Sequence, residues 1–314
     1  MKSATASAPG KFVILGEHAV VFGKPAVALA INRRITCTIR ESHRFIINGE
    51  PDELVRHPHI QYLLDEHGLK GIEIISESNL LSGAGLGSSA ALCASLSCAI
   101  RSMLGKSVEE EDIIKEAYAA EYHSQGVGSP MDTSASVHGG GIGLNIPDLG
   151  EIIWTVENEG RRWDVFDIHT PEMTFVIGYT GVKAHTGPLV KKVRRYRDRN
   201  GFAKDIINEI GDLTLDGAKL LREDDRCGLG ELMTRNHKLL SILGVSSPEL
   251  NRLVNAANEY SYGAKLTGAG GGGSMIALTD RPERVCETIR LHGGIPIIVS
   301  TGEPGVRVEP LRFQ

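Results

Sequence analysis

The sequence predicts a protein of mixed α and β structure with two domains, of residues 1–165 and 166–314. Three observations support this prediction. Short apolar runs that alternate like strands stand beside longer apolar stretches typical of helices in both halves of the chain. The 314 residues favour two domains or one large one. Past Asn145 the composition changes, because residues 147–167 are polar and interrupted by glycine.

In the first half, strands are expected at residues 12–15, 34–40 and 71–76. Residues 19–22 are expected to resume the first strand after the interruption at Gly16-Glu17-His18. Helices are predicted over residues 52–67 and over the small, apolar residues 92–104. The His57-Pro58-His59 cluster is interpreted as a surface feature, because residues two apart do not share a helix face.

In the second half, residues 173–179 are expected to form a strand and helices are expected to fill residues 201–262. Strands at 264–267 and 275–278, a helix over 284–291 and closing strands at 296–300 and 306–309 complete the prediction. The strongly basic residues 191–199 are interpreted as the solvated face of a helix and not as a nucleic-acid site.

Composition and charge exclude several classes of protein. The net charge of −5 gives no global attraction to nucleic acid or to an anionic membrane. The apolar runs are too short to span a bilayer, and the first ten residues lack the apolar core of a signal peptide. Five scattered cysteines without a Cys-x-x-Cys pair favour a reducing compartment and argue against a zinc site. A cytoplasmic protein is therefore expected; the oligomeric state is open, with a homodimer as one candidate.

The most informative stretch runs from Gly83 to Ala91, where a predicted strand passes into a predicted helix. The first N–H groups of a helix lack intrahelical partners, and the helix dipole adds partial positive charge there. Glycine allows a ligand to approach the backbone closely, so this turn is predicted to bind phosphate. The predicted nucleotide-binding residues are Gly83, Ala84, Gly85, Leu86, Gly87, Ser88, Ser89 and Ala90.

Two alternatives to this interpretation remain open at the level of the residues. The stretch could be an ordinary glycine turn with a serine that caps the helix. Residues 85–90 also fit the loose fingerprint of a Rossmann dehydrogenase, although Glu109 would then have to be the ribose-binding acid.

Two acidic residues and a hydroxyl suggest phosphoryl-transfer chemistry. Glu121 falls on the apolar face of its predicted helix, where a buried carboxylate needs a cation beside it. Asp132 lies where another helix can begin. Together with Ser89 they could supply magnesium ligands and a base. A second glycine-rich loop, residues 268–273, also favours close approach of its backbone to a ligand.

Three separate stretches together resemble one family. They are Ala8-Pro9-Gly10-Lys11 with Gly16-Glu17-His18-Ala19-Val20-Val21, then residues 83–91, then residues 265–273. In this order they are similar to the three motifs of the GHMP kinases (galactokinase, homoserine kinase, mevalonate kinase and phosphomevalonate kinase). The first stretch resembles the mevalonate kinase branch. The resemblance implies an α+β fold, with an N-terminal domain like domain 2 of ribosomal protein S5 and a ferredoxin-like C-terminal domain closing the active-site cleft.

The resemblance also implies a reaction and residue roles. ATP would phosphorylate the primary hydroxyl of mevalonate, with Mg²⁺ as the metal cofactor, in isoprenoid biosynthesis. Asp132 and Lys11 match the catalytic aspartate and lysine, and Ser89 and Glu121 match the magnesium ligands. The residues that match the substrate pocket are Glu17, His18, Thr186 and Ala269. Another GHMP kinase, such as a phosphomevalonate kinase, and a non-catalytic sensor on the same fold are the alternatives within the family.

Overall fold

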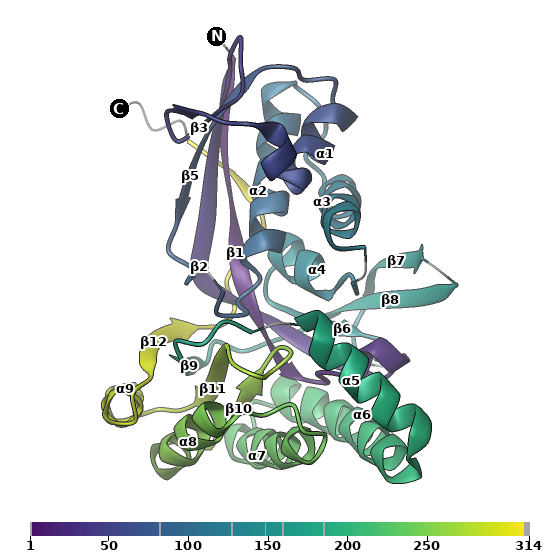
Figure 1. Ribbon diagram of the computed structural model, residues 1–314, viewed down its shortest axis with the longest axis vertical. Helices are drawn as coiled ribbons and strands as arrows, with labels where there is room; N and C mark the ends of the chain where they lie inside the picture. Colours follow the sequence, from purple (N-terminus) through teal and green to yellow (C-terminus); the bar gives the residue numbers. More distant parts are fainter. Residues whose placement is uncertain are drawn as a thin grey trace.

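Two β-sheets organise the molecule, one in the upper and one in the lower part of Figure 1. The computed structural model describes residues 2–81, 83–126, 128–147, 149–158, 160–184 and 186–310, apart from the side chains of residues 125 and 186. Within these residues the larger sheet has nine strands and the smaller sheet has four. Together with the helices packed on them, they form the mixed α and β architecture that the sequence predicts. The division at residues 165 and 166 stays a prediction.

The larger sheet is built around two long strands, β1 (Ser3–Leu15) and β2 (Ala26–Glu41), which pair in antiparallel fashion. Its neighbours are antiparallel except β3, which is parallel to β5. The other strands are β3 (Ile46–Ile47), β4 (Glu50–Pro51), β5 (Ile72–Ser78), β6 (Gly141–Leu144), β7 (Ile152–Asn158), β8 (Arg161–Ile168) and β13 (Arg307–Glu309). A largely antiparallel sheet overturns the Rossmann alternative, because that fold needs parallel strands.

Four helices lie together beside the larger sheet in Figure 1: α1 (Pro58–Glu66), α2 (Ser88–Met103), α3 (Glu110–Gln125) and α4 (Met131–His138). The buried residues of α2 are mostly alanine, serine and cysteine, so the helix packs closely on β1 and β2. Two short 3₁₀ helices, η1 (Val20–Phe22) and η2 (Leu54–Arg56), complete this part. The expectation of a resumed strand at residues 19–22 was wrong, since the chain turns there instead of extending.

The smaller sheet has the order β10-β11-β9-β12 and is antiparallel throughout. Its strands are β9 (Thr174–Tyr179), β10 (Gly263–Thr267), β11 (Ser274–Leu278) and β12 (Ile295–Ser300). The helices around it are α5 (Thr186–Arg199), α6 (Gly201–Arg222), α7 (Arg226–Ile242), α8 (Pro248–Ala257), η3 (Asn258–Tyr260) and α9 (Pro282–Leu291). These bounds confirm the predicted strands and helices of the second half to within a few residues.

The two sheets are joined through the C-terminal half of β1. The rings of Phe12 and Phe175 have centroids 4.8 Å apart, so β1 packs against β9 in one continuous core. The hydroxyl of Thr267 on β10 donates to the carbonyl of Val13 at 2.9 Å and accepts from its N–H at 3.1 Å. Residues of β1 near this junction are therefore held in place by both sheets.

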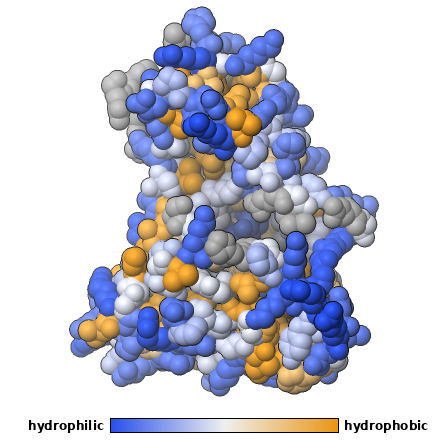
Figure 2. Space-filling view, in the orientation of Figure 1, coloured by the Kyte–Doolittle hydropathy of each residue, from blue (hydrophilic) through white to orange (hydrophobic). Residues whose placement is uncertain are grey.

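The basic residues within 191–199 lie where the sequence predicts, on the surface of a helix. Figure 2 shows strongly hydrophilic side chains over α5, where the basic residues expected on a solvated helix face lie exposed. No helix among the described residues is both long and apolar enough to cross a membrane.

Candidate active site

Lys11 lies on β1 close to this junction, and its ammonium pairs with a carboxylate from a distant part of the chain. Lys11 Nζ lies 2.8 Å from Asp132 Oδ1. Asp132 stands in the first turn of α4, as the sequence predicts. The lysine side chain is only 4% exposed and the aspartate side chain is 44% exposed. A ligand can therefore reach the carboxylate, whereas the lysine is enclosed by protein.

The glycine loop after β5 lies directly against this pair. The N–H of Lys11 donates to the carbonyl of Leu86 at 3.0 Å, which ties the loop to β1. A Cβ at Gly87 would lie 3.0 Å from Lys11 Cε, and one at Gly10 would lie 2.8 Å from the Leu86 carbonyl oxygen. Glycine at these positions therefore lets the loop and the lysine side chain approach each other.

The loop ends at the N-terminus of α2 in a form suited to anions. Gly83, Gly85 and Gly87 have φ values of 75°, 78° and 72°, a left-handed conformation that glycine adopts without strain. Among the described side chains none caps this helix, and its first turn has no acidic residue. The N–H groups and the dipole of α2 therefore face the same region as the Lys11 ammonium, which is an arrangement that attracts phosphate.

Ser89 and Glu121, the predicted metal ligands, are in direct contact. The hydroxyl of Ser89 donates to Glu121 Oε1 from the first turn of α2 to the C-terminal half of α3. The Glu121 side chain is 14% exposed, in keeping with its predicted place on the apolar face. A hydroxyl and a carboxylate are hard oxygen donors, so the pair fits Mg²⁺.

His59 on α1 also reaches this pair. Its Nε2 lies 3.0 Å from Ser89 Oγ and 3.4 Å from Glu121 Oε1. The His59 side chain is 22% exposed, so it lies partly at the surface, and tertiary packing of α1 against α2 and α3 gives it contacts that the sequence did not predict. The helix periodicity within α1 contains no sign of these contacts.

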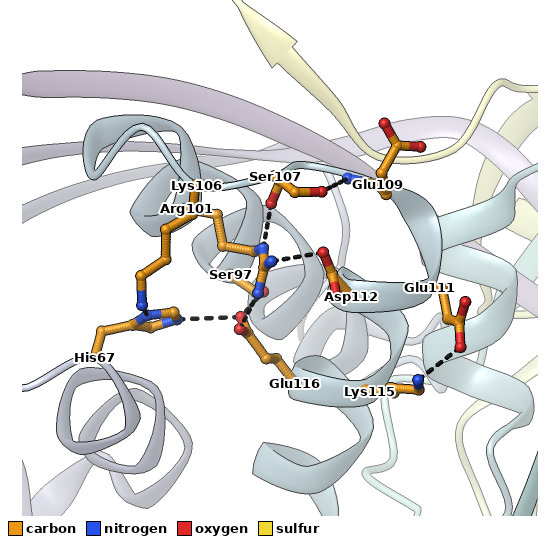
Figure 3. A network of polar contacts seen from close by, with 10 residues as sticks. All are labelled: His67, Ser97, Arg101, Lys106, Ser107, Glu109, Glu111, Asp112, Lys115 and Glu116. Carbon is orange, nitrogen blue, oxygen red and sulfur yellow. Dashed lines mark hydrogen bonds and ion pairs between the residues drawn. The ribbon is translucent and has the colours of Figure 1, made fainter.

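A polar network joins α2 to α3 further along the two helices (Figure 3). The Arg101 guanidinium on α2 pairs with Glu116 and, at 2.6 Å, with Asp112 on α3. Ser97 donates to the same Glu116 carboxylate at 2.6 Å, and His67 Nε2 lies 3.2 Å from it. Because charged pairs that are mostly shielded from water resist rearrangement, this network keeps the two helices in register.

Glu17 takes part in a fully buried ion pair. Its carboxylate contacts the ammonium of Lys265 on β10, whose side chain has no exposed surface, and accepts from Asn236 Nδ2 at 3.2 Å. Burial lowers the pKa of Lys265, and the Glu17 charge opposes that shift. The pair anchors the turn after β1 to the smaller sheet.

His18 follows Glu17 in that turn and adopts a left-handed φ of 61°, which is uncommon for a residue other than glycine. Its Nε2 lies 2.8 Å from the carbonyl oxygen of Ala269 in the second glycine loop. Burial lowers the pKa of His18, so the ring is neutral and Nε2 is the donor. Its Nδ1 is then a buried acceptor, which has no hydrogen-bond partner among the described residues.

Burial also lowers the pKa of His237 on α7. Together with the smaller effect of the positive charge on Lys265, it brings this pKa to about 4. Its Nδ1 accepts from the N–H of Leu266 at 3.2 Å, which requires the neutral ring. His237 therefore supports β10 beside the Glu17–Lys265 pair without adding a second charge.

The second glycine loop, residues 268–273, contacts the first through the residue that follows it. Ser274, just after residues 268–273, donates its hydroxyl proton to the carbonyl of Ala84 at 2.8 Å. The N–H of Gly273 donates to Val182 at 2.7 Å, and a Cβ at Gly83 would lie 3.5 Å from Lys183 Cγ. Thr186 begins α5 nearby, but its side chain lies outside the described residues.

With this geometry in place, comparison with known proteins identifies the family. The family model described as "GHMP kinases N terminal domain" matches residues 54–140, and "GHMP kinases C terminal" matches residues 218–293. The curated mevalonate kinase of Pyrococcus abyssi is 34% identical over 98% of both chains, and that of Methanothermobacter thermautotrophicus is 35% identical over 88% of this chain and 90% of its own. The chain belongs to the mevalonate kinase family of the GHMP kinases.

Solved structures of GHMP kinases have the same fold. The Methanococcus jannaschii mevalonate kinase matches with a TM-score of 0.78 at 25% identity, covering 95% of this chain and 98% of that one. The L. major mevalonate kinase in complex with R-mevalonate gives a TM-score of 0.81 at 21% identity, covering 95% of each chain, and supports the fold alone. As a GHMP kinase, this chain is expected to use ATP.

Sequence reasoning missed two residues that contact Ser89 or Glu121 in this GHMP kinase. His59 comes from another helix, so only the fold could reveal it. Cys93 lies four residues after Ser89 on α2, and its Sγ is 3.9 Å from Glu121 Oε1. The i, i+4 spacing to Ser89 was a signal in the sequence that could have placed Cys93 on the same helix face.

Proposed function

We propose that the chain transfers the γ-phosphoryl group of ATP to the primary hydroxyl of (R)-mevalonate, giving 5-phosphomevalonate and ADP, in cytoplasmic isoprenoid biosynthesis. The observation that carries this proposal is the Lys11–Asp132 pair at the N-terminus of α2. A cation, a carboxylate and free helix N–H groups meet where the γ-phosphate and the attacking hydroxyl would have to meet.

Asp132 is the group proposed to accept the hydroxyl proton. The substrate oxygen forms a bond to the γ-phosphorus, the bond from that phosphorus to the β-phosphate oxygen breaks, and the proton passes to the Asp132 carboxylate. The Lys11 ammonium, 2.8 Å from Asp132, would stabilise the negative charge on the phosphoryl oxygens.

The loop of residues 83–90 is proposed to hold the nucleotide phosphates. Its glycines expose backbone N–H groups, and the start of α2 adds the helix dipole. Lys183, which lies over Gly83 from the loop after β9, is a further cation within reach of the same phosphates.

Ser89 and Glu121 are proposed to hold Mg²⁺. When bound, Mg²⁺ would neutralise part of the negative charge on the phosphates during transfer. Because the Ser89 hydroxyl donates directly to Glu121, the two groups are close enough to act as ligands of one ion.

His18, Thr186 and Ala269 are proposed to line the mevalonate pocket, with Glu17 beneath them. The hydrogen bond from His18 Nε2 to the Ala269 carbonyl holds these two residues together, which supports placing both in one pocket wall. The Glu17 carboxylate is engaged by Lys265 and Asn236, and its proposed role is therefore to hold the turn that carries His18.

A direct test measures ADP release with mevalonate, phosphomevalonate, homoserine and galactose as acceptors, with and without Mg²⁺. Rapid turnover with mevalonate alone, dependent on Mg²⁺, is expected. Faster turnover with another acceptor would reassign the substrate within the GHMP kinases. ATP binding without turnover of any acceptor would favour the sensor alternative, which the convergence of Lys11, Glu121 and Asp132 argues against. Sedimentation analysis of the same sample would test the homodimer.

A further inference from the structure

The environment of Glu121 contains more donors than a magnesium site needs. One carboxylate oxygen, Oε1, is approached by the Ser89 hydroxyl, by His59 Nε2 at 3.4 Å and by Cys93 Sγ at 3.9 Å. His59 stands on α1, Ser89 and Cys93 stand on α2, and Glu121 itself stands on α3. The nitrogen, oxygen and sulfur atoms of these groups therefore lie close together around the Glu121 carboxylate. Such atoms could all bind one cation.

The separations suit a small tetrahedral ion. One ligand atom each from His59, Cys93 and Glu121 all lie within 4.8 Å of one another. In a tetrahedral zinc site, bonds of about 2.0–2.3 Å place neighbouring ligand atoms about 3.3–3.6 Å apart. The observed 3.4 Å and 3.9 Å contacts with Glu121 are near the required values, and the remaining separation, between His59 and Cys93, is at most 4.8 Å.

The donor types favour a different metal from Mg²⁺. Magnesium prefers oxygen ligands, whereas an imidazole nitrogen with a cysteine sulfur is typical of Zn²⁺ and other thiophilic divalent ions. Cys93 is 1% exposed, and His59 and Glu121 are partly exposed, so an ion would enter from their side and meet the sulfur innermost.

We propose that His59, Cys93 and Glu121 form a Zn²⁺ site that shares Glu121 with the expected magnesium site. Nε2 of the histidine, the sulfur of the cysteine and a carboxylate oxygen are the three protein ligands, and the Ser89 hydroxyl or a water takes the fourth position. The thiol proton passes to solvent when the sulfur binds. Zn²⁺ and Mg²⁺ then exclude each other, which makes Zn²⁺ an inhibitor of Mg²⁺-dependent turnover.

The first test uses Co²⁺ as an absorbing substitute for Zn²⁺ in the full chain without nucleotide. A thiolate-to-cobalt charge-transfer band and intense visible bands of a tetrahedral ion are expected, and Zn²⁺ should remove them. Cys93→Ser should abolish the charge-transfer band, whereas the matched control Cys98→Ser, on the same helix, should keep it. The proposal is overturned if the parent chain shows no such band or if the band survives in Cys93→Ser.

The second test measures Zn²⁺ affinity by calorimetry. His59→Gln should weaken binding at least about tenfold, as loss of a ligand requires. His57→Gln is the matched control, because His57 pairs with Asp52 away from the site, and it should bind as the parent does. Equal affinity in the two variants would exclude His59 as a ligand. Both tests detect binding without turnover, so their failure would leave the proposed kinase activity untouched.

A third measurement connects the site to turnover. Zn²⁺ should inhibit the parent enzyme competitively with Mg²⁺. Cys93→Ala should need at least about tenfold more Zn²⁺ for the same fractional loss of its own Mg²⁺-dependent turnover. Circular dichroism confirms that each variant is folded. Inhibition that is unchanged in folded Cys93→Ala would contradict the shared site.

Discussion

Two lysine–carboxylate pairs, built from the same chemical groups, serve different ends in this molecule. In the Lys11–Asp132 pair the lysine is almost buried, but the carboxylate is 44% exposed and faces the proposed phosphate site. In the Lys265–Glu17 pair the side chains are 0% and 2% exposed, and Asn236 occupies a further position on the carboxylate. One pair has an accessible oxygen, and the other is enclosed by protein.

The difference shows that burial determines what an ion pair can do. A carboxylate with an exposed oxygen can accept a proton or bind a hydroxyl, because its second partner can be a ligand. A fully enclosed pair has already lost its hydration, so its remaining function is to keep two segments together. Substitutions in the Lys11–Asp132 pair are thus expected to lower activity more than stability. Substitutions in the Lys265–Glu17 pair are expected to lower stability more than activity.

Asp132→Asn should show the largest difference between the two pairs, because it should lower activity strongly and stability little. Removing the proton acceptor is expected to reduce kcat about 10²- to 10⁴-fold. The free energy of unfolding should fall by at most about 1 kcal/mol, because the pair is partly exposed and the amide oxygen still accepts from Lys11. Steady-state ADP release and urea unfolding provide the two numbers. Parent-like turnover would remove Asp132 from the mechanism.

Lys265→Met should show the reverse pattern. It leaves the Glu17 carboxylate buried without its cation, which is expected to cost about 3–5 kcal/mol of folding free energy. Adding Glu17→Gln removes the unpaired charge and should restore more than half of that loss. The urea midpoints of the single and double variants form a double-mutant cycle, and strictly additive effects would show that the two residues are not coupled.

The lowered pKa of His237, beside the Lys265–Glu17 pair, predicts how the free energy of unfolding depends on pH. Its pKa is about 4 in the folded chain and near 6.5 when unfolded, so the unfolded state binds more protons between these values. Stability is therefore full above about pH 6.5 and falls by about 3 kcal/mol as pH drops towards 4. Urea unfolding from pH 4 to 7 would measure this slope. His237→Gln should flatten it, and an unchanged slope would assign the acid sensitivity to other groups.

Gly87→Ala should disturb the exposed pair alone. The left-handed φ of 72° makes a side chain cost about 1–2 kcal/mol, and its Cβ would lie 3.0 Å from both Lys11 Cγ and Cε. Gly85→Ala is the matched control, because its φ is 78° but no atom lies within 4 Å of the added Cβ. Similar losses of stability are expected, with a further loss of kcat, about tenfold, in Gly87→Ala only. Equal kcat values would show that Lys11 tolerates displacement.

Local sequence signals predicted the elements and the motifs well. The helix after the glycine loop, the start of α4 at Asp132 and the apolar placement of Glu121 follow from periodicity and turn residues within a few positions. The order of the three motifs pointed to the GHMP kinases before any contact was known. The error at residues 19–22 came from an apolar run that is too short to distinguish a strand from a turn.

Contacts between distant segments could not be predicted in this way. His59 stands on a helix whose own pattern says nothing of α2 and α3, yet its ring contacts Ser89 and Glu121. The pairing of Glu17 with Lys265 likewise depends on β1 meeting the smaller sheet.

The sequence by itself determined the family, the secondary structure around each motif and the residue types available for chemistry, because these depend on neighbours along the chain. Only the tertiary structure decided which carboxylate stays open to a ligand and which is enclosed. Exposure depends on what other segments cover, and in this protein those segments come from both sheets.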